Sequence, residues 1–139
     1  MATATSPRIR LGLFVQPVGQ HVSGWRLTEK LGDPTDIDWL ITIAKKAEAG
    51  KFDLFFVGDA LATSMYRLPS TMARLEPLTM LSALAVNIKR IGLAATASTT
   101  FRAPFTMARS FSSLDHISRG RAAWNVALSF STDVARNFS

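Results

Sequence analysis

The chain has 139 residues, 47% of them hydrophobic, which fits one domain with a buried core and excludes a chain that is disordered throughout. It has no cysteine, so disulfides, thiolate metal sites and redox control through thiols are excluded, and no metal site is predicted. The net charge of +6 comes from scattered Lys and Arg residues without a dense basic run, which favours a solvated surface over nucleic-acid binding.

The first predicted strand covers residues 9–15, a β-rich run that is too short for a secretion signal. In the helix that follows, Thr35 and Asp38 resemble a capping box, and Gly50 is the expected end. Residues 52–57 are a short, nearly all-apolar run, which is typical of a strand covered on both faces in a parallel sheet. Nothing approaches the roughly 20 apolar residues of a membrane helix, so we expect a cytoplasmic protein without membrane contact.

A second helix is predicted from Glu76 and Pro77, with Lys89 and Arg90 in its last turn, where positive charge is favourable. The third strand is predicted over residues 91–97.

A third helix is expected to begin at Pro104 and to end before Gly120. Its inner side is predicted to consist of Met107, Phe111, Leu114 and Ile117. The fourth strand is predicted over residues 121–126. The order is therefore βαβαβαβ, and every helix is long enough to cross over between parallel strands.

Parallel βα units build either an open doubly wound sheet or a closed eight-stranded barrel. Two features favour the barrel. No Gly-x-Gly-x-x-Gly or Gly-Lys-Ser/Thr loop follows any strand, and the long loops all follow strands, where a barrel places its active site. A barrel usually needs about 250 residues, however, and this α/β chain offers only four strands.

Four blocks of sequence carry a resemblance to a known family. They are residues 13–17 (LFVQP), 51–56 (KFDLFF), 75–79 (LEPLT) and 114–126 (LDHISRGRAAWNV). Together they resemble the bacterial luciferase-like flavin-dependent monooxygenases, in the branch of the nitrilotriacetate and dibenzothiophene-sulfone monooxygenases. The match runs over nearly the whole chain. It implies that residues 1–139 are the N-terminal half of a luciferase-like (β/α)8 TIM barrel, a single partial domain that supplies about the first four βα units.

The resemblance also implies an activity. Members of the family use reduced FMN (FMNH2), delivered by a separate NAD(P)H-dependent flavin reductase, to insert one oxygen atom of O2 into a small organic substrate. The cofactor supplies the difficult chemistry, while the protein holds the ring, excludes water and orients the substrate. The identity of that substrate cannot be read from the loops.

Candidate flavin contacts stand where the predicted strands end. Asp59 can accept a hydrogen bond from a ring N–H or a ribityl hydroxyl, and Ser98, Thr99 and Asn125 can serve the carbonyls and nitrogens of the ring. The simpler alternatives are a turn or cap role for Asp59 and the satisfaction of backbone groups by Ser98 and Thr99. Trp124 neighbours Asn125 and is therefore expected to point to the opposite face, as a packing residue.

The resemblance suggests a catalytic residue as well. It places His21 in the loop after the first strand, where a histidine can face the substrate and the flavin and exchange a proton near neutral pH. Without the resemblance, His21 is an ordinary loop histidine.

The chain departs from the family pattern at two points. Arg119 stands before Gly120 where the family has paired glycines, and because a Cβ at positive φ costs about 1 kcal/mol, we expect the turn to shift. Leu128 precedes Ser129 where the family favours a Thr-Ser pair, so a hydroxyl contact at 128 is lost. No residue that binds the FMN phosphate can be assigned.

Four strands leave two unpaired sheet edges and an uncovered inner face. We therefore expect the 139-residue product to self-associate as a homo-oligomer, for example by pairing two half-barrels, or to be poorly soluble. The alternative to an enzyme is a truncated, non-catalytic half-barrel, either a fragment of a longer protein or a self-association module.

Overall fold

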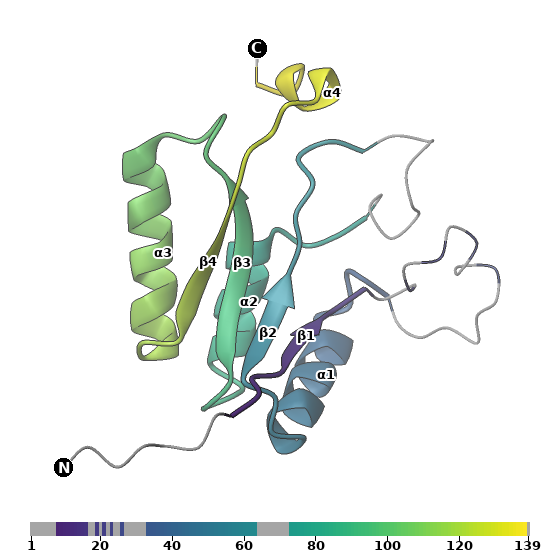
Figure 1. The fold of residues 1–139 in the computed structure, drawn as a ribbon, viewed down its shortest axis with the longest axis vertical. Coiled ribbons are helices and arrows are strands. Elements are labelled where there is room, and N and C mark those ends of the chain that lie inside the picture. The colour runs from purple at the N-terminus through teal and green to yellow at the C-terminus, as the bar shows by residue number, and fades with distance from the viewer. Residues whose placement is uncertain are drawn as a thin grey trace.

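The structure, a computed structural model, describes residues 8–16, 19, 21, 23, 26, 33–63 and 73–138. Four parallel strands form one sheet in the order of the chain: β1 (Gly12–Phe14), β2 (Leu54–Val57), β3 (Gly92–Ser98) and β4 (Ala122–Ala127). The connections hold α1 (Ile37–Ala49), α2 (Pro77–Ala85) and α3 (Pro104–Ser118), and α4 (Thr132–Ala135) follows β4 (Figure 1). The predicted alternation of strands and helices is confirmed. Within the described ranges, no helix combines the length and the apolar character needed to cross a bilayer.

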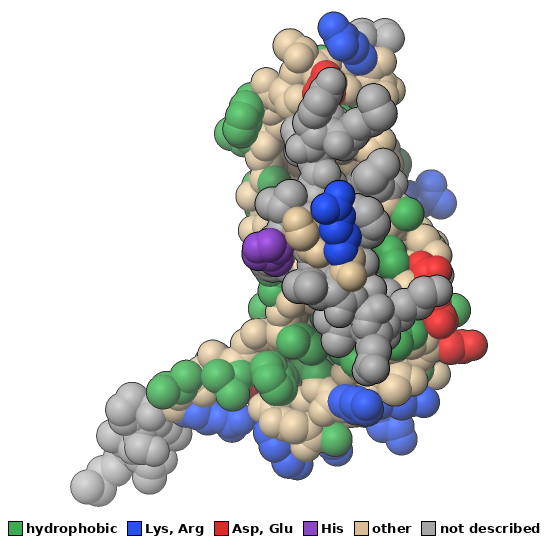
Figure 2. Space-filling view, turned by 90° about the vertical axis from the view of Figure 1, so that its right-hand side faces the viewer, with side chains coloured by type: hydrophobic (Ala, Val, Ile, Leu, Met, Phe, Trp, Pro, Cys, Tyr) green, Lys and Arg blue, Asp and Glu red, His purple; other side chains and the backbone are tan. Residues whose placement is uncertain are grey.

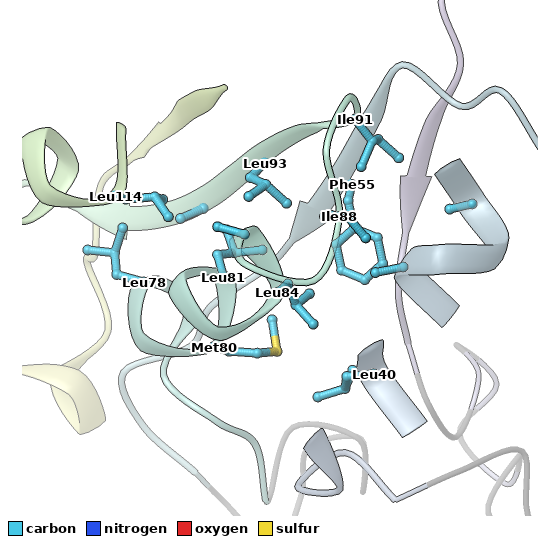
Figure 3. Close-up of a cluster of buried hydrophobic side chains, with 14 residues drawn as sticks. Leu40, Phe55, Leu78, Met80, Leu81, Leu84, Ile88, Ile91, Leu93 and Leu114 are labelled. Carbon is cyan, nitrogen blue, oxygen red and sulfur yellow. The ribbon is translucent and has the colours of Figure 1, made fainter. Parts of the chain in front are cut away.

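The three long helices cover one face of the sheet. Leu13, Phe55, Leu93 and Ala122 are aligned across the four strands and belong to or pack against one hydrophobic cluster, to which all three helices contribute. Figure 3 shows Leu81 and Leu84 of α2 next to Leu93 and Phe55 of the sheet.

A doubly wound sheet reverses its strand order and has helices on both faces. Consecutive parallel strands with helices on one face are instead the arrangement of a partial (β/α)8 barrel, as predicted.

Charged side chains fasten the amino ends of the strands. Asp53 accepts hydrogen bonds from Arg10 Nη1 (2.8 Å) and from the backbone N–H of Leu11 (3.0 Å), which ties the segment before β1 to β2. Glu48 at the end of α1 accepts from three consecutive backbone N–H groups just before β3. Figure 2 shows Lys and Arg side chains gathered at the lower end of the molecule, which is this amino end of the sheet.

The structure corrects the predicted ends of two helices. Asp36, rather than Thr35, caps α1, because its carboxylate accepts from the backbone N–H groups of Asp38 and Trp39. Helix α2 ends at Ala85, so Lys89 and Arg90 do not form its last turn. Their backbone N–H groups bind Glu48 instead, which gives these donors a partner outside any helix.

Two strands are shorter than predicted, since β1 covers three residues instead of residues 9–15 and β2 covers four instead of residues 52–57. Strands β3 and β4 have the predicted lengths, each displaced by one residue. Helix α3 has the predicted start, but Ile117 is 44% exposed and Ser118 is fully buried in its place. Ser118 donates to the carbonyl oxygen of Asp115 and accepts from the backbone N–H of Arg121, so its hydroxyl is satisfied inside the protein.

The turn after α3 does not shift. Arg119 (φ 61°) and Gly120 (φ 80°) both adopt positive φ, and their N–H groups donate to the carbonyl oxygens of His116 and Asp115. The expectation that a Cβ would displace this turn was wrong, because the helix-terminal hydrogen bonds hold Arg119 in the left-handed conformation.

Candidate active site

The carboxyl ends of β2, β3 and β4 meet around a cavity of about 180 Å³, at the upper end of the strands in Figure 1. The loop after β2 and the segment between β4 and α4 complete its wall. Asn137, which follows α4, ties the end of the described chain to the loop after β2, since its Nδ2 donates to the carbonyl oxygen of Leu61 at 2.7 Å. The polar part of the lining is formed by Asp59, Thr96, Ser98, Ser129 and Ser131.

Two pairs of side chains connect β3 with β4 and the segment after it. Thr96 and Asn125 are register partners, and Asn125 Nδ2 donates to Thr96 Oγ1 at 2.9 Å. Ser129 Oγ donates to Ser98 Oγ at 2.8 Å, and Ser98 Oγ also accepts from the backbone N–H of Thr100 at 3.2 Å. Because a hydroxyl oxygen can accept two hydrogen bonds and its hydrogen can be donated in a third, Ser98 can still donate a hydrogen bond to a group in the cavity.

Asp59 is the acidic group of the cavity, and it is half-buried. Burial raises the pKa of Asp59 above the ordinary value, although the backbone N–H of Ala60 and the charges of Arg74 and Arg102 act in the opposite direction. Arg102 is itself paired with Glu76 at 3.5 Å. The carboxyl group can therefore accept hydrogen bonds when ionised, or donate one when it holds a proton.

The structure brings together part of the predicted site. Asp59 and Ser98 line the one cavity, and Asn125 is joined to it through Thr96. Thr99 lies on the helix side, where it lines a separate hollow with Trp124, and its backbone N–H donates to the carbonyl oxygen of Ala127 at 3.0 Å. The predicted packing role of Trp124 is confirmed by its ring contact with Phe111 (5.1 Å between ring centroids).

His21 is exposed in the loop after β1. Its Nδ1 accepts from the backbone N–H of Ser23 at 3.1 Å, so a neutral imidazole carries its proton on Nε2. It is not among the described residues that line the cavity, and its catalytic role stays a prediction.

Sequence reasoning missed Thr96 and Ser129. The alternation of side chains along a strand could have found Thr96, because Thr96 and Ser98 stand two residues apart and share a face, whereas Thr99 points the other way. Ser129 supplies a hydroxyl next to Leu128, which is 75% exposed. Leu128 has no hydroxyl to offer the cavity, but Ser129, the next residue, supplies one.

Comparisons with known proteins agree with this architecture. The model of the luciferase-like monooxygenase family matches residues 10–139. The chain is 45% identical to N-acetyl-S-(2-succino)cysteine monooxygenase of Bacillus subtilis, over 99% of this chain and 31% of that protein. It is 40% identical to nitrilotriacetate monooxygenase component A of Aminobacter aminovorans, over 94% and 32%. It is 36% identical to dibenzothiophene-sulfone monooxygenase of Rhodococcus erythropolis, over 91% and 30%. The chain thus spans about a third of the length of these relatives.

Two solved structures share the fold. EDTA monooxygenase from Chelativorans sp. BNC1 superposes with a TM-score of 0.86 at 26% identity, over 95% of this chain and 32% of that chain. A riboflavin lyase, solved with modified FMN and its substrate riboflavin, gives a TM-score of 0.82 at 26% identity, over 95% and 32%.

Proposed function

Because the chain belongs to the luciferase-like monooxygenase family, we propose that it is the N-terminal half of the barrel of a two-component, FMNH2-dependent monooxygenase. The proposed reaction inserts one oxygen atom of O2 into a small organic substrate, with reduced FMN supplied by a separate NAD(P)H-dependent reductase. One observation carries the proposal: Asp59, Thr96, Ser98 and Ser129 converge on one cavity at the carboxyl ends of parallel strands, which is where barrels place active sites.

The cavity suits one edge of a flavin ring. That edge carries both N–H and C=O groups, and the lining offers a carboxyl group and several hydroxyls that donate and accept. Its volume of about 180 Å³ is below the roughly 300–1,000 Å³ of complete ligand pockets. The remainder of the cofactor would therefore lie outside it.

Each side chain has a defined role in this proposal. Asp59 accepts a hydrogen bond from a ring N–H or a ribityl hydroxyl, and Ser98, held by Ser129, donates to a ring carbonyl. Asn125 keeps its Oδ1 as an acceptor, because Nδ2 is engaged by Thr96. The bound flavin supplies the electrons that activate oxygen.

Two further residues complete the proposed site. His21 donates from Nε2 to the substrate or to the reacting oxygen, since its Nδ1 is occupied by Ser23. Thr99 remains a proposed flavin contact through the end of β3, although it lines the hollow on the helix side.

Anaerobic titration of the full-length protein with reduced FMN tests the proposal. Replacement of the Ser98 hydroxyl in Ser98→Ala should weaken binding about five- to tenfold, the effect of one hydrogen bond of roughly 1–1.4 kcal/mol. Ser113→Ala is the matched control, because Ser113 is exposed on α3 and its hydroxyl donates only to the carbonyl oxygen of Arg109. A full-length protein that does not bind reduced FMN would refute the proposal.

The second candidate is a non-catalytic half-barrel that self-associates. It is favoured by the edge strand β4 and the segment after it, where Val126, Leu128 and Phe130 are 61%, 75% and 96% exposed. Unpaired strand edges and exposed apolar side chains promote association between chains. Light scattering of the 139-residue product tests this candidate, and a monodisperse monomer would contradict it.

A further inference from the structure

Residues 128–138, which follow β4 and contain α4, form a strap at the carboxyl ends of the strands, at the upper end of the molecule in Figure 1. The strap contributes Ser129 and Val134 to the lining of the active-site cavity. The loop after β2 contributes Asp59 and Leu61 to the same lining. The strap and this loop are therefore two walls of one cavity that come from distant parts of the chain.

The first part of the strap is fastened to the end of β3. Ser129 Oγ donates to Ser98 Oγ at 2.8 Å, and the backbone N–H of Ser129 donates to Thr100 Oγ1 at 2.9 Å. These two hydrogen bonds fix the start of the strap, but neither of them reaches the loop after β2.

The last part of the strap is fastened to the loop after β2 by Asn137. Its backbone N–H donates to the carbonyl oxygen of Val134 at 3.0 Å, and its Nδ2 donates to the carbonyl oxygen of Leu61 at 2.7 Å. The next residue, Phe138, stacks on Phe101 with 4.9 Å between the ring centroids and an interplanar angle of 6°. Asn137 is not among the described residues that line the cavity, yet it bonds to two that do.

Helix α4 depends on these contacts for its position. It has four residues, and a helix of that length is not stable in water by itself. Its Val134 is only 6% exposed, whereas Thr132 and Asp133 are exposed, so one side chain turns inward to the cavity. The bond from Asn137 to Leu61 therefore sets how α4 stands relative to the loop after β2.

The same bond restricts Asp59. Strand β2 ends at Val57, so the sheet holds the chain two residues before Asp59, and Asn137 holds it two residues after, at Leu61. Asp59 thus lies in a short bridge between two fixed points. Displacement of a binding group by about 1 Å is enough to impair its function.

We propose that Asn137 is a positioning residue, which holds Asp59 in place for the flavin by bonding to Leu61 and Val134 together. The contribution of Asp59 to flavin binding rests on the proposed function. Without the side chain of Asn137, the loop and the strap would adopt several arrangements, of which only some bind flavin. Binding would then have to order them, and the affinity would fall by the fraction of molecules that are ordered beforehand.

Anaerobic titration of the full-length protein with reduced FMN measures this effect. Asn137→Ala should weaken binding about three- to tenfold, the range of one hydrogen bond. Asn87→Ala is the matched control, because Asn87 is also exposed and its Nδ2 donates to the carbonyl oxygen of Ala83 at 2.9 Å, next to the end of α2. The control should change the affinity by less than about twofold. Equal affinity of the wild type and Asn137→Ala would overturn the proposal.

A double-mutant cycle separates positioning from a general structural effect. If Asn137 acts through Asp59, Asn137→Ala should change reduced-FMN affinity by no more than about twofold in the Asp59→Asn background. A structural effect elsewhere would weaken binding equally in both backgrounds, and that result would overturn the proposal.

The carboxyl group of Asp59 also reports its own environment without any flavin. Burial raises the pKa of Asp59, while the backbone N–H of Ala60 and the charges of Arg74 and Arg102 lower it and the charge of Glu76 raises it. If the loop and the strap separate, water reaches the carboxyl group and the effect of burial decreases. Loss of Asn137 should therefore move the pKa of Asp59 down, toward the ordinary value.

A 13C NMR titration of the flavin-free, full-length protein measures this pKa in the wild type, Asn137→Ala and Asn87→Ala. We expect a lower pKa of Asp59 in Asn137→Ala and no change in Asn87→Ala. An unchanged pKa in Asn137→Ala would overturn the positioning role. A lowered pKa in a protein that does not bind reduced FMN would refute the proposed function and leave the positioning of Asp59 standing.

Discussion

Arg121 provides the sharpest test of how the strands are held. Its guanidinium donates four hydrogen bonds, all to backbone carbonyl oxygens. Nη1 donates to Ile91 (2.9 Å) and Nε to Ser118 (2.7 Å). Nη2 donates to both Ala85 (2.9 Å) and Ile88 (3.0 Å). One side chain thus ties the end of α2, the turn before β3 and the end of α3 to the start of β4.

We expect Arg121→Met to destabilise the protein while preserving most of the side-chain volume. A net value of roughly 1 kcal/mol per hydrogen bond gives about 4 kcal/mol for the four bonds together. Because the side chain is only half-buried, water can replace some of the lost donors, and we expect a loss of about 2–4 kcal/mol in the free energy of unfolding.

Urea unfolding followed by tryptophan fluorescence measures this loss. With a slope near 2 kcal/mol per molar urea, the midpoint should fall by roughly 1–2 M. Arg121→Lys keeps the charge but has one side-chain nitrogen instead of three, so its stability should lie between those of the wild type and Arg121→Met. Arg109→Gln, which removes an exposed arginine on α3, is the control for the loss of a charge. An unfolding free energy of Arg121→Met within about 0.5 kcal/mol of the wild type would refute the reasoning.

Three further predictions concern the site and the pH dependence of stability. Burial raises the pKa of Asp59, so its ionisation is unfavourable in the folded state, and stability should decline as the pH rises above the ordinary Asp value of about 3.9; Asp59→Asn should remove this decline in thermal unfolding from pH 4 to pH 8 and weaken reduced-FMN binding. Burial raises the pKa of Glu48, but three backbone N–H groups and the charge of Arg90 lower it overall, so its contribution is present at neutral pH and lost as the pH falls below about 4.3. Glu48→Gln should therefore destabilise the protein at pH 7 more than at pH 3, and an equal effect at both would contradict this assignment. Finally, Thr96→Val should weaken reduced-FMN binding more than Thr99→Val, because only the hydroxyl of Thr96 lines the cavity; the reverse order in anaerobic titration would place the flavin on the other side of β3.

The predicted end of α2 was wrong because a side chain distant in the sequence accepts hydrogen bonds from the backbone N–H groups that follow this helix. The composition of the segment after Ala85 is compatible with a continued helix, and Lys89 and Arg90 suit a last turn. Glu48, some forty residues away in the chain, instead accepts hydrogen bonds from both backbone N–H groups. No local pattern contains that contact.

Predictions of the site failed for a different reason. Asp59 and Ser98 were found because polar residues at strand ends are recognisable in sequence, and their convergence follows from the parallel order of the strands. Thr96 lies within β3, and its position in the strand does not by itself mark it as a site residue. The register with β4 sets it opposite Asn125, on the face of the sheet away from the helices.

The sequence by itself determined the alternation of strands and helices and the parallel sheet, because apolar periodicity and the lengths of the crossovers are local properties of the chain. It also determined which polar groups stand at the carboxyl ends of the strands. Only the tertiary structure decided which hydroxyls share the cavity and where α2 ends. These outcomes depend on contacts between residues far apart in the chain, whose geometry exists only once the strands are paired and the helices are packed on them.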